Sequence, residues 1–150
     1  MIVIGLDPCS TKNLGFCVFN DTELVTCGTN VLVGINSFLE INDFMEELVE
    51  DYSPDLVIME RSIGLGFAPL REKICENTGA IKMLLSQKGI KFDVMNTKSA
   101  YKTVIGTCKK IDNKKKNTIA WIKKEYNLDV NEHAADSILM VRAHYATAND

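Results

Sequence analysis

The sequence lacks the features of a membrane, secreted or zinc-binding protein. No apolar run approaches the roughly 20 residues of a membrane helix, and the N-terminal apolar run is too short for a signal peptide. The five cysteines are odd in number and do not have the spacing of zinc ligands. We therefore expect free thiols and a soluble protein of a reducing compartment, the cytoplasm.

The sequence also has no internal repeat, no linker and no low-complexity segment beyond a short lysine cluster. A chain of 150 residues is most simply one domain, and it is long enough to bury a core. We therefore predict a single domain over residues 1–150.

One part of the chain has almost no acids, and another has no bases. Between Lys98 and Lys124 there are nine lysines and a single acid, whereas eight acids and no base lie between Glu40 and Glu60. The net charge of -3 therefore conceals a strong segregation, which predicts a basic face on an acidic protein.

Apolar spacing and turn residues predict five strands and five helices. The expected strands are 1–7, 14–19, 24–33, 55–60 and 90–94, and the expected helices are 37–53, 70–88, 97–105, 113–126 and 131–147. An antiparallel meander followed by crossover strands gives a mixed five-stranded sheet with helices on both faces. This is an α/β fold of the ribonuclease H-like kind.

Two of the predicted strands end on an acid. Asp7 closes the first strand and Glu60 closes the fourth, and these strands are neighbours in the predicted sheet. Near the start of the last helix, either His133 or Glu132 shares a helical face with Asp136. Each acid alone fits an ordinary role in a turn, a strand end or a helix surface, but together they indicate one site.

Carboxylates that converge repel one another, and a divalent cation relieves this repulsion. Mg²⁺ prefers oxygen ligands and needs few protein contacts. Two such ions about 4 Å apart activate water and stabilise the leaving oxygen in phosphodiester cleavage. The acids therefore predict a metal-dependent nuclease.

Four segments resemble the RuvC family of Holliday junction resolvases, in the family's order and over nearly the whole chain. They are IGLDPCSTKNLGFCVF (4–19), PDLVIMERSIG (54–64), SAYKTVIG (99–106) and HAADSILMVRAH (133–144). The compact length is similar to that of poxvirus and phage members, which favours a viral enzyme in the host cytoplasm or a viral factory.

The resemblance implies catalytic and metal-binding roles for Asp7, Glu60 and Asp136. His133 falls where most members have another aspartate, although some members have histidine there, and neutral histidine can bind a divalent ion. Glu132 is the alternative if the helix begins differently. The implied cofactor is Mg²⁺, with two ions in each site and Mn²⁺ as a substitute.

The resemblance also implies DNA contacts in the basic stretch. Lys102 lies near the family's active-site lysine, within one residue of register, and would neutralise charge at the scissile phosphate. Lys98 shares its helical face, and Lys115 and Lys116 lie where the family has a second DNA-contacting lysine. A lysine run can also be a solvated face, so these contacts are expectations.

Two further expectations follow from the resemblance. Phe67, or Ile63 by strict position, would approach unstacked bases at the junction centre. The predicted helix 70–88 would carry a homodimer interface, at which Gly79 would permit close helix approach. A two-fold dimer is what places one active site on each of two opposing strands.

We therefore expect an endonuclease that resolves four-way DNA junctions by paired symmetric nicks and leaves 5′-phosphate ends. The alternative is another ribonuclease H-like nuclease, acting on branched DNA, flaps or RNA–DNA hybrids. A non-catalytic junction-binding module would not need the intact acids. An ATPase of the actin and hexokinase type needs two such domains, and 150 residues hold only one.

Overall fold

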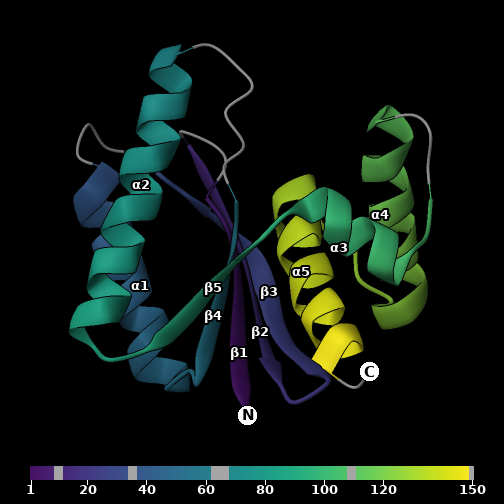
Figure 1. Ribbon diagram of the computed structural model, residues 1–150, viewed down its shortest axis with the longest axis horizontal. Coiled ribbons are helices and arrows are strands. Elements are labelled where there is room, and N and C mark those ends of the chain that lie inside the picture. Colours follow the sequence, from purple (N-terminus) through teal and green to yellow (C-terminus); the bar gives the residue numbers. More distant parts are fainter. Residues whose placement is uncertain (9–11, 34–36, 62–67, 108–110, 149–150) are drawn as a thin grey trace.

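The chain, in a computed structural model that describes residues 1–8, 12–33, 37–61, 68–107 and 111–148, forms one sheet between two groups of helices (Figure 1). The strands are β1 (Ile2–Asp7), β2 (Asn13–Asn20), β3 (Glu23–Val31), β4 (Leu56–Glu60) and β5 (Lys91–Met95). The helices are α1 (Ser37–Tyr52), α2 (Ala68–Gln87), α3 (Thr97–Val104), α4 (Ile111–Tyr126) and α5 (Glu132–Ala148).

The sheet is mixed, with the strand order β3-β2-β1-β4-β5. β1, β2 and β3 form the antiparallel meander, and β4 and β5 run parallel to β1. The predicted ribonuclease H-like α/β fold is therefore confirmed. Because β1 and β4 are parallel, their carboxyl ends lie at the same edge of the sheet.

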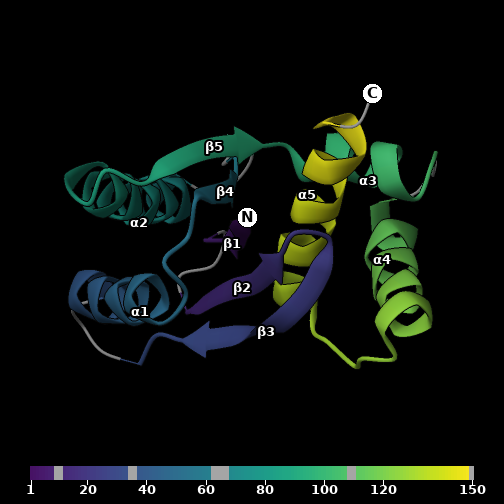
Figure 2. The same ribbon diagram turned by 90° about the horizontal axis from the view of Figure 1, so that it is seen from below.

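Helices cover both faces of the sheet (Figure 2). α1 and α2 lie on one face, and α5 lies on the other with α3 and α4 packed outside it. A hydrophobic core lies on each face of the sheet, and the alternating side chains of β1 contribute to both. Val3 packs on the α5 side, whereas Ile4 and Leu6 pack on the side of α1 and α2. β4 is buried on both faces, which explains its continuous apolar run.

α5 crosses the sheet at two glycines. A Cβ atom on Gly5 would lie 2.5 Å from the carbonyl oxygen of Ser137, and one on Gly15 would lie 2.3 Å from that of His133. Only a residue without a side chain lets the helix backbone approach this closely. These two contacts fix the height of the first turns of α5 above the ends of β1 and β2.

The element boundaries differ from the predicted ones by a few residues at most, which is the usual scatter at helix and strand ends. The three cysteines in the described ranges, Cys17, Cys27 and Cys75, are free thiols, as expected. None of the helices in the described part of the chain is long and apolar enough to cross a membrane.

Candidate active site

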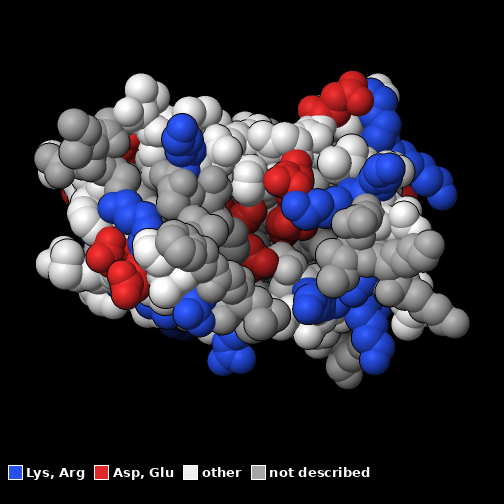
Figure 3. Space-filling model, turned by 90° about the horizontal axis from the view of Figure 1, so that it is seen from above, with Lys and Arg blue, Asp and Glu red and all other residues white. Residues whose placement is uncertain are grey.

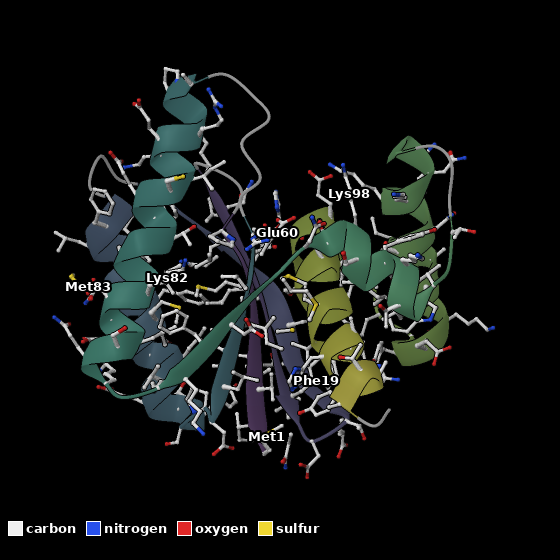
Figure 4. All side chains as sticks on the ribbon, viewed as in Figure 1. Met1, Phe19, Glu60, Lys82, Met83 and Lys98 are labelled. Atoms are coloured by element: carbon white, nitrogen blue, oxygen red, sulfur yellow. The ribbon has the colours of Figure 1, made fainter. Side chains whose placement is uncertain are left out.

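The strand register brings Asp7 and Glu60 to one edge of the sheet. Leu6 pairs with Met59 in the parallel ladder, so the next residue of β1 is level with the next residue of β4. The side chain of Asp7 is only 1% exposed. Figure 4 shows Glu60 at this edge, close to the beginning of α3, where its Oε1 accepts a hydrogen bond of 2.7 Å from Thr97 Oγ1.

The N-terminus of α5 is fixed by Asn131. Its Oδ1 accepts the backbone N–H of Ala134 at 3.0 Å, as expected for an N-cap, and it also accepts the hydroxyl of Thr29 on β3 at 2.8 Å. This cap places His133 over the end of β1, where Nδ1 of His133 lies 2.9 Å from Oδ2 of Asp7. The first strand and the last helix therefore meet at one buried carboxylate.

The acids of this site perturb one another. Burial, reinforced by the charges of Asp7 and Glu132, raises the pKa of Asp136 to about 7. The hydrogen bond to Asp7 raises the pKa of His133 above its usual value, against the opposing effect of burial. The shift of Asp136 arises first from burial and that of His133 first from its bond to Asp7, and in both the neighbouring carboxylates add to the rise in pKa.

A lysine from α4 reaches the same cluster. Nζ of Lys115 makes an ion pair with Oε2 of Glu132, and the other oxygen of Glu132 lies 3.8 Å from Nε2 of His133. The hydrogen bond to Glu132 raises the pKa of Lys115, and the charges of Asp136 and Asp7 add to this effect. Lys115 is therefore paired at the acids, although its side chain is 57% exposed.

A cavity of about 130 Å³ opens beside the acids, between α3, α4 and α5. Its lining residues are Thr97, Lys98, Tyr101, Lys114, Lys115, Thr118, Asp136 and Leu139. Tyr101 is buried, and its hydroxyl accepts a hydrogen bond of 3.0 Å from Nδ2 of Asn117. Figure 3 shows the acidic side chains in a hollow of this face, with lysine and arginine side chains around it.

The donor set suits a divalent metal. Carboxylate oxygens and an imidazole nitrogen are ligands of Mg²⁺ and Mn²⁺. Within the described ranges, however, no three His, Cys, Asp or Glu side chains are arranged to hold one ion. Oδ2 of Asp7 lies against His133 and Oε1 of Glu60 accepts a hydrogen bond from Thr97, and each carboxylate has a second oxygen.

The structure separates the predicted lysines into two groups. Lys98 and Lys115 line the cavity. Lys102 is exposed in the last turn of α3, Lys116 is exposed on α4, and neither is among the described residues that line the cavity. Phe67 lies outside the described residues, as does Ile63, so the predicted contact with bases stays a prediction.

Sequence reasoning missed four residues of this site: Thr97, Tyr101, Lys114 and Gly15. Thr97 follows the end of β5 at the same sheet edge as Asp7 and Glu60, and that position could have identified it. The approach of His133 to Gly15 and the burial of Tyr101 depend on helix packing, for which the sequence carries no local signal.

No family model and no curated protein matches the sequence. Among solved structures, RuvC of T. thermophilus, in complex with a Holliday junction substrate, has a TM-score of 0.81 and 16% identity over 99% of this chain and 96% of that chain. Fowlpox virus resolvase, in complex with Holliday junction DNA, has a TM-score of 0.69 and 18% identity over 100% of both chains.

The yeast mitochondrial Holliday junction resolvase Ydc2 has a TM-score of 0.57 and 20% identity, covering 96% of this chain and 77% of that chain. These identities are low, so the likeness concerns the path of the backbone. The helix and strand arrangement that carries the acids is nevertheless the same along almost the whole chain. The fold of this protein is the RuvC-like ribonuclease H fold of these resolvases.

Proposed function

We propose that this protein is a metal-dependent endonuclease that resolves four-way DNA junctions. The observation that carries the proposal is the position of Asp7 and Glu60 at the ends of neighbouring strands, with His133 bonded to Asp7 and with Asp136 lining a cavity that lysines also line. Acids alone would fit many metal sites. Their combination with lysines on two neighbouring helices favours a phosphodiester as the substrate.

In this proposal Asp7, Glu60 and Asp136, together with His133, hold Mg²⁺, and Mn²⁺ is able to substitute. Two ions per site would supply a water activated for attack on phosphorus and would neutralise the leaving oxygen. The chain's own groups orient the ligands: Thr97 holds Glu60, and His133 holds Asp7. The burial of Asp7 limits the access of bulk water to this carboxylate.

The lysines supply affinity for the sugar-phosphate backbone. Lys98, Lys114 and Lys115 surround a cavity next to the acids, where a phosphate would be neutralised from several sides. Lys102 and Lys116 lie further out on the same two helices and would contact phosphates along a DNA arm. Such contacts give salt-dependent binding without sequence information.

The choice of a four-way junction rests on the solved structures with this fold. RuvC and the fowlpox virus resolvase are each seen in complex with Holliday junction DNA. We extend this substrate to the present chain, with Phe67 near the unstacked bases at the junction centre. The full mutual coverage with the fowlpox protein also supports a compact viral enzyme, which would act in the reducing cytoplasm of a host or in a viral factory.

A homodimer would deliver the paired symmetric nicks and the 5′-phosphate ends. α2 supports this role because the side chain of Met83 is 61% exposed and points away from the sheet, beside Lys82 (Figure 4). A Cβ atom on Gly79 would meet nothing within 4 Å, so a second helix has room to approach there. Two sites related by a two-fold axis would meet opposing strands of the junction.

A panel of labelled substrates tests the proposal. The protein is incubated with a synthetic four-way junction, a linear duplex and an RNA–DNA hybrid, with Mg²⁺ present or chelated. We expect metal-dependent symmetric nicks in the junction and little cleavage of the other two. Cleavage of the hybrid with an intact junction would overturn the substrate, and binding without any cleavage would overturn the enzymatic role.

A further inference from the structure

The ion pair between Lys115 and Glu132 joins two helices directly at the acidic cluster. Lys115 comes from the second turn of α4, and Glu132 is the first residue of α5. Lys115 and Asp136 line the same cavity, and Glu132 also faces the imidazole of His133 at 3.8 Å. The ammonium group of Lys115 therefore lies within reach of the charges of Asp136 and Asp7, which the proposed function assigns to metal.

Two ligands of the proposed site would disturb the ion pair between Lys115 and Glu132: a divalent cation and a DNA phosphate. A divalent cation would occupy the same negative field and would repel the ammonium group of Lys115, although the side chain of Lys115 is 57% exposed. A DNA phosphate in the cavity would attract the same lysine, with a charge similar to that of Glu132. The carboxylate of Glu132 and the phosphate would then compete for the ammonium group of Lys115.

We propose that Glu132 is a positioning residue that holds Lys115 as an internal counter-ion in the DNA-free protein and releases it to a phosphate when metal and junction bind. This inference rests on the proposed function, because it assumes that the acids bind metal and the cavity binds DNA. In this inference Glu132 binds Lys115 and is not a metal ligand. The metal ligands are Asp7, Glu60, His133 and Asp136.

The chain offers a matched control pair. Nζ of Lys123, about two turns further along α4, lies 2.6 Å from Oδ2 of Asp129, in the segment that leads into α5. This pair also joins α4 to the chain before α5, but neither member lines the cavity or perturbs Asp136. Lys123→Met and Asp129→Asn therefore make the same changes in charge away from the site.

The first test measures Mg²⁺ binding by calorimetry without DNA. We expect Lys115→Met to bind Mg²⁺ several-fold more tightly than the wild type, whereas Lys123→Met leaves the affinity within about twofold. We expect Glu132→Gln to change the affinity less than threefold, whereas Asp136→Asn weakens it at least tenfold. An unchanged affinity in Lys115→Met, or a loss in Glu132→Gln as large as that in Asp136→Asn, would overturn the inference.

The second test measures binding of a labelled junction in the presence of a chelator. We expect Glu132→Gln to bind several-fold more tightly than Asp129→Asn, because Lys115 no longer has to leave a carboxylate. Lys115→Met should bind more weakly, with a salt dependence reduced by about one ion. A gain from Glu132→Gln that persists in the Lys115→Met background would contradict the inference, because the two effects must depend on each other.

The two tests separate this inference from the proposed function. A wild-type protein that does not bind the junction contradicts the proposed function, and the calorimetric test then decides the role of Glu132 without DNA. A wild-type protein that binds and cleaves the junction, but shows no effect of Lys115→Met on Mg²⁺ affinity, contradicts only the inference.

Discussion

Nδ1 of His133 lies 2.9 Å from Oδ2 of Asp7, so that the first strand of the chain is joined to its last helix at a buried carboxylate. A buried carboxylate is costly without a partner, and His133 provides one. The pair lies at the edge of the sheet where β1 and β4 end. It therefore ties the stability of the fold to the charge of the proposed site.

The bond between His133 and Asp7 predicts a pH-dependent contribution to stability in the metal-free protein. The pKa of His133 is raised in the folded state, so its stabilising effect is complete below about pH 6.5 and is lost as the pH rises through the raised value. We expect His133→Gln to lower the melting temperature more at pH 6 than at pH 9. A difference that is constant across this range would contradict the assignment.

Asp136 also makes the folded protein less stable as the pH rises, but here we expect the substitution to stabilise the protein. Its pKa is raised from 3.8 to about 7, so the folded protein loses stability as the pH rises from about 4 to 7 without metal. We expect Asp136→Asn to melt about 3 °C or more above the wild type at pH 8 in chelator, given that 1 kcal/mol corresponds to roughly 2–4 °C for a domain of this size.

The same variant has two internal controls. The difference in melting temperature between Asp136→Asn and the wild type should nearly vanish below about pH 3, where the carboxyl is protonated in both the folded and the unfolded chain. Saturating Mg²⁺ should stabilise the wild type and narrow the difference, because a ligand stabilises the state that binds it. An Asp136→Asn protein that is less stable than the wild type at pH 8 would contradict this prediction.

The close approach of α5 at Gly15 predicts that adding one methyl group there strongly destabilises the fold. A Cβ atom there would lie 2.3 Å from the backbone carbonyl of His133, and neither backbone can yield without moving α5. We expect Gly15→Ala to cost about 1–3 kcal/mol or more in urea unfolding, with loss of junction cleavage. Gly28→Ala is the control, because its Cβ would lie 3.1 Å from the side chain of Phe16, which can shift. Equal costs for the two variants would contradict the close approach.

The proposed dimer predicts that a charge on the outer face of α2 separates the protomers. We expect the wild type to sediment as a dimer and Met83→Glu as a monomer. Val25→Glu, at a similarly exposed position of the edge strand β3, should remain dimeric. On a cruciform plasmid the monomer should produce single nicks instead of the paired cuts that linearise it. A wild type that sediments as a monomer would contradict the proposal.

Much of the fold could be predicted from the sequence, because the deciding signals are local. The acid at the end of each apolar run marked the ends of β1 and β4, and Asn131 marked the start of α5. The continuous apolar run of β4 indicated burial on both faces. These signals were enough to predict that Asp7 and Glu60 end neighbouring strands at one edge of the sheet.

The rest of the site depends on how the helices pack. The sequence suggested both Lys98 and Lys102 on α3, and of these two it is Lys98 that lines the cavity, together with Tyr101. The pairing of Lys115 with Glu132 requires α4 to lie against α5. The spacing of residues along the chain does not predict how these two helices pack. Family resemblance located the basic stretch, whereas the phase of each helix decided which lysines reach the acids.

Cleavage of a labelled four-way junction by Glu60→Gln, compared with the wild type at saturating Mg²⁺, decides whether the acids at the sheet edge form an active site. The variant keeps the shape of the side chain and its distance from Thr97 but removes the charge that would hold the metal. We expect it to bind the junction at least as tightly as the wild type and to cleave it at least a hundredfold more slowly. Cleavage at the wild-type rate would contradict the proposed catalytic site.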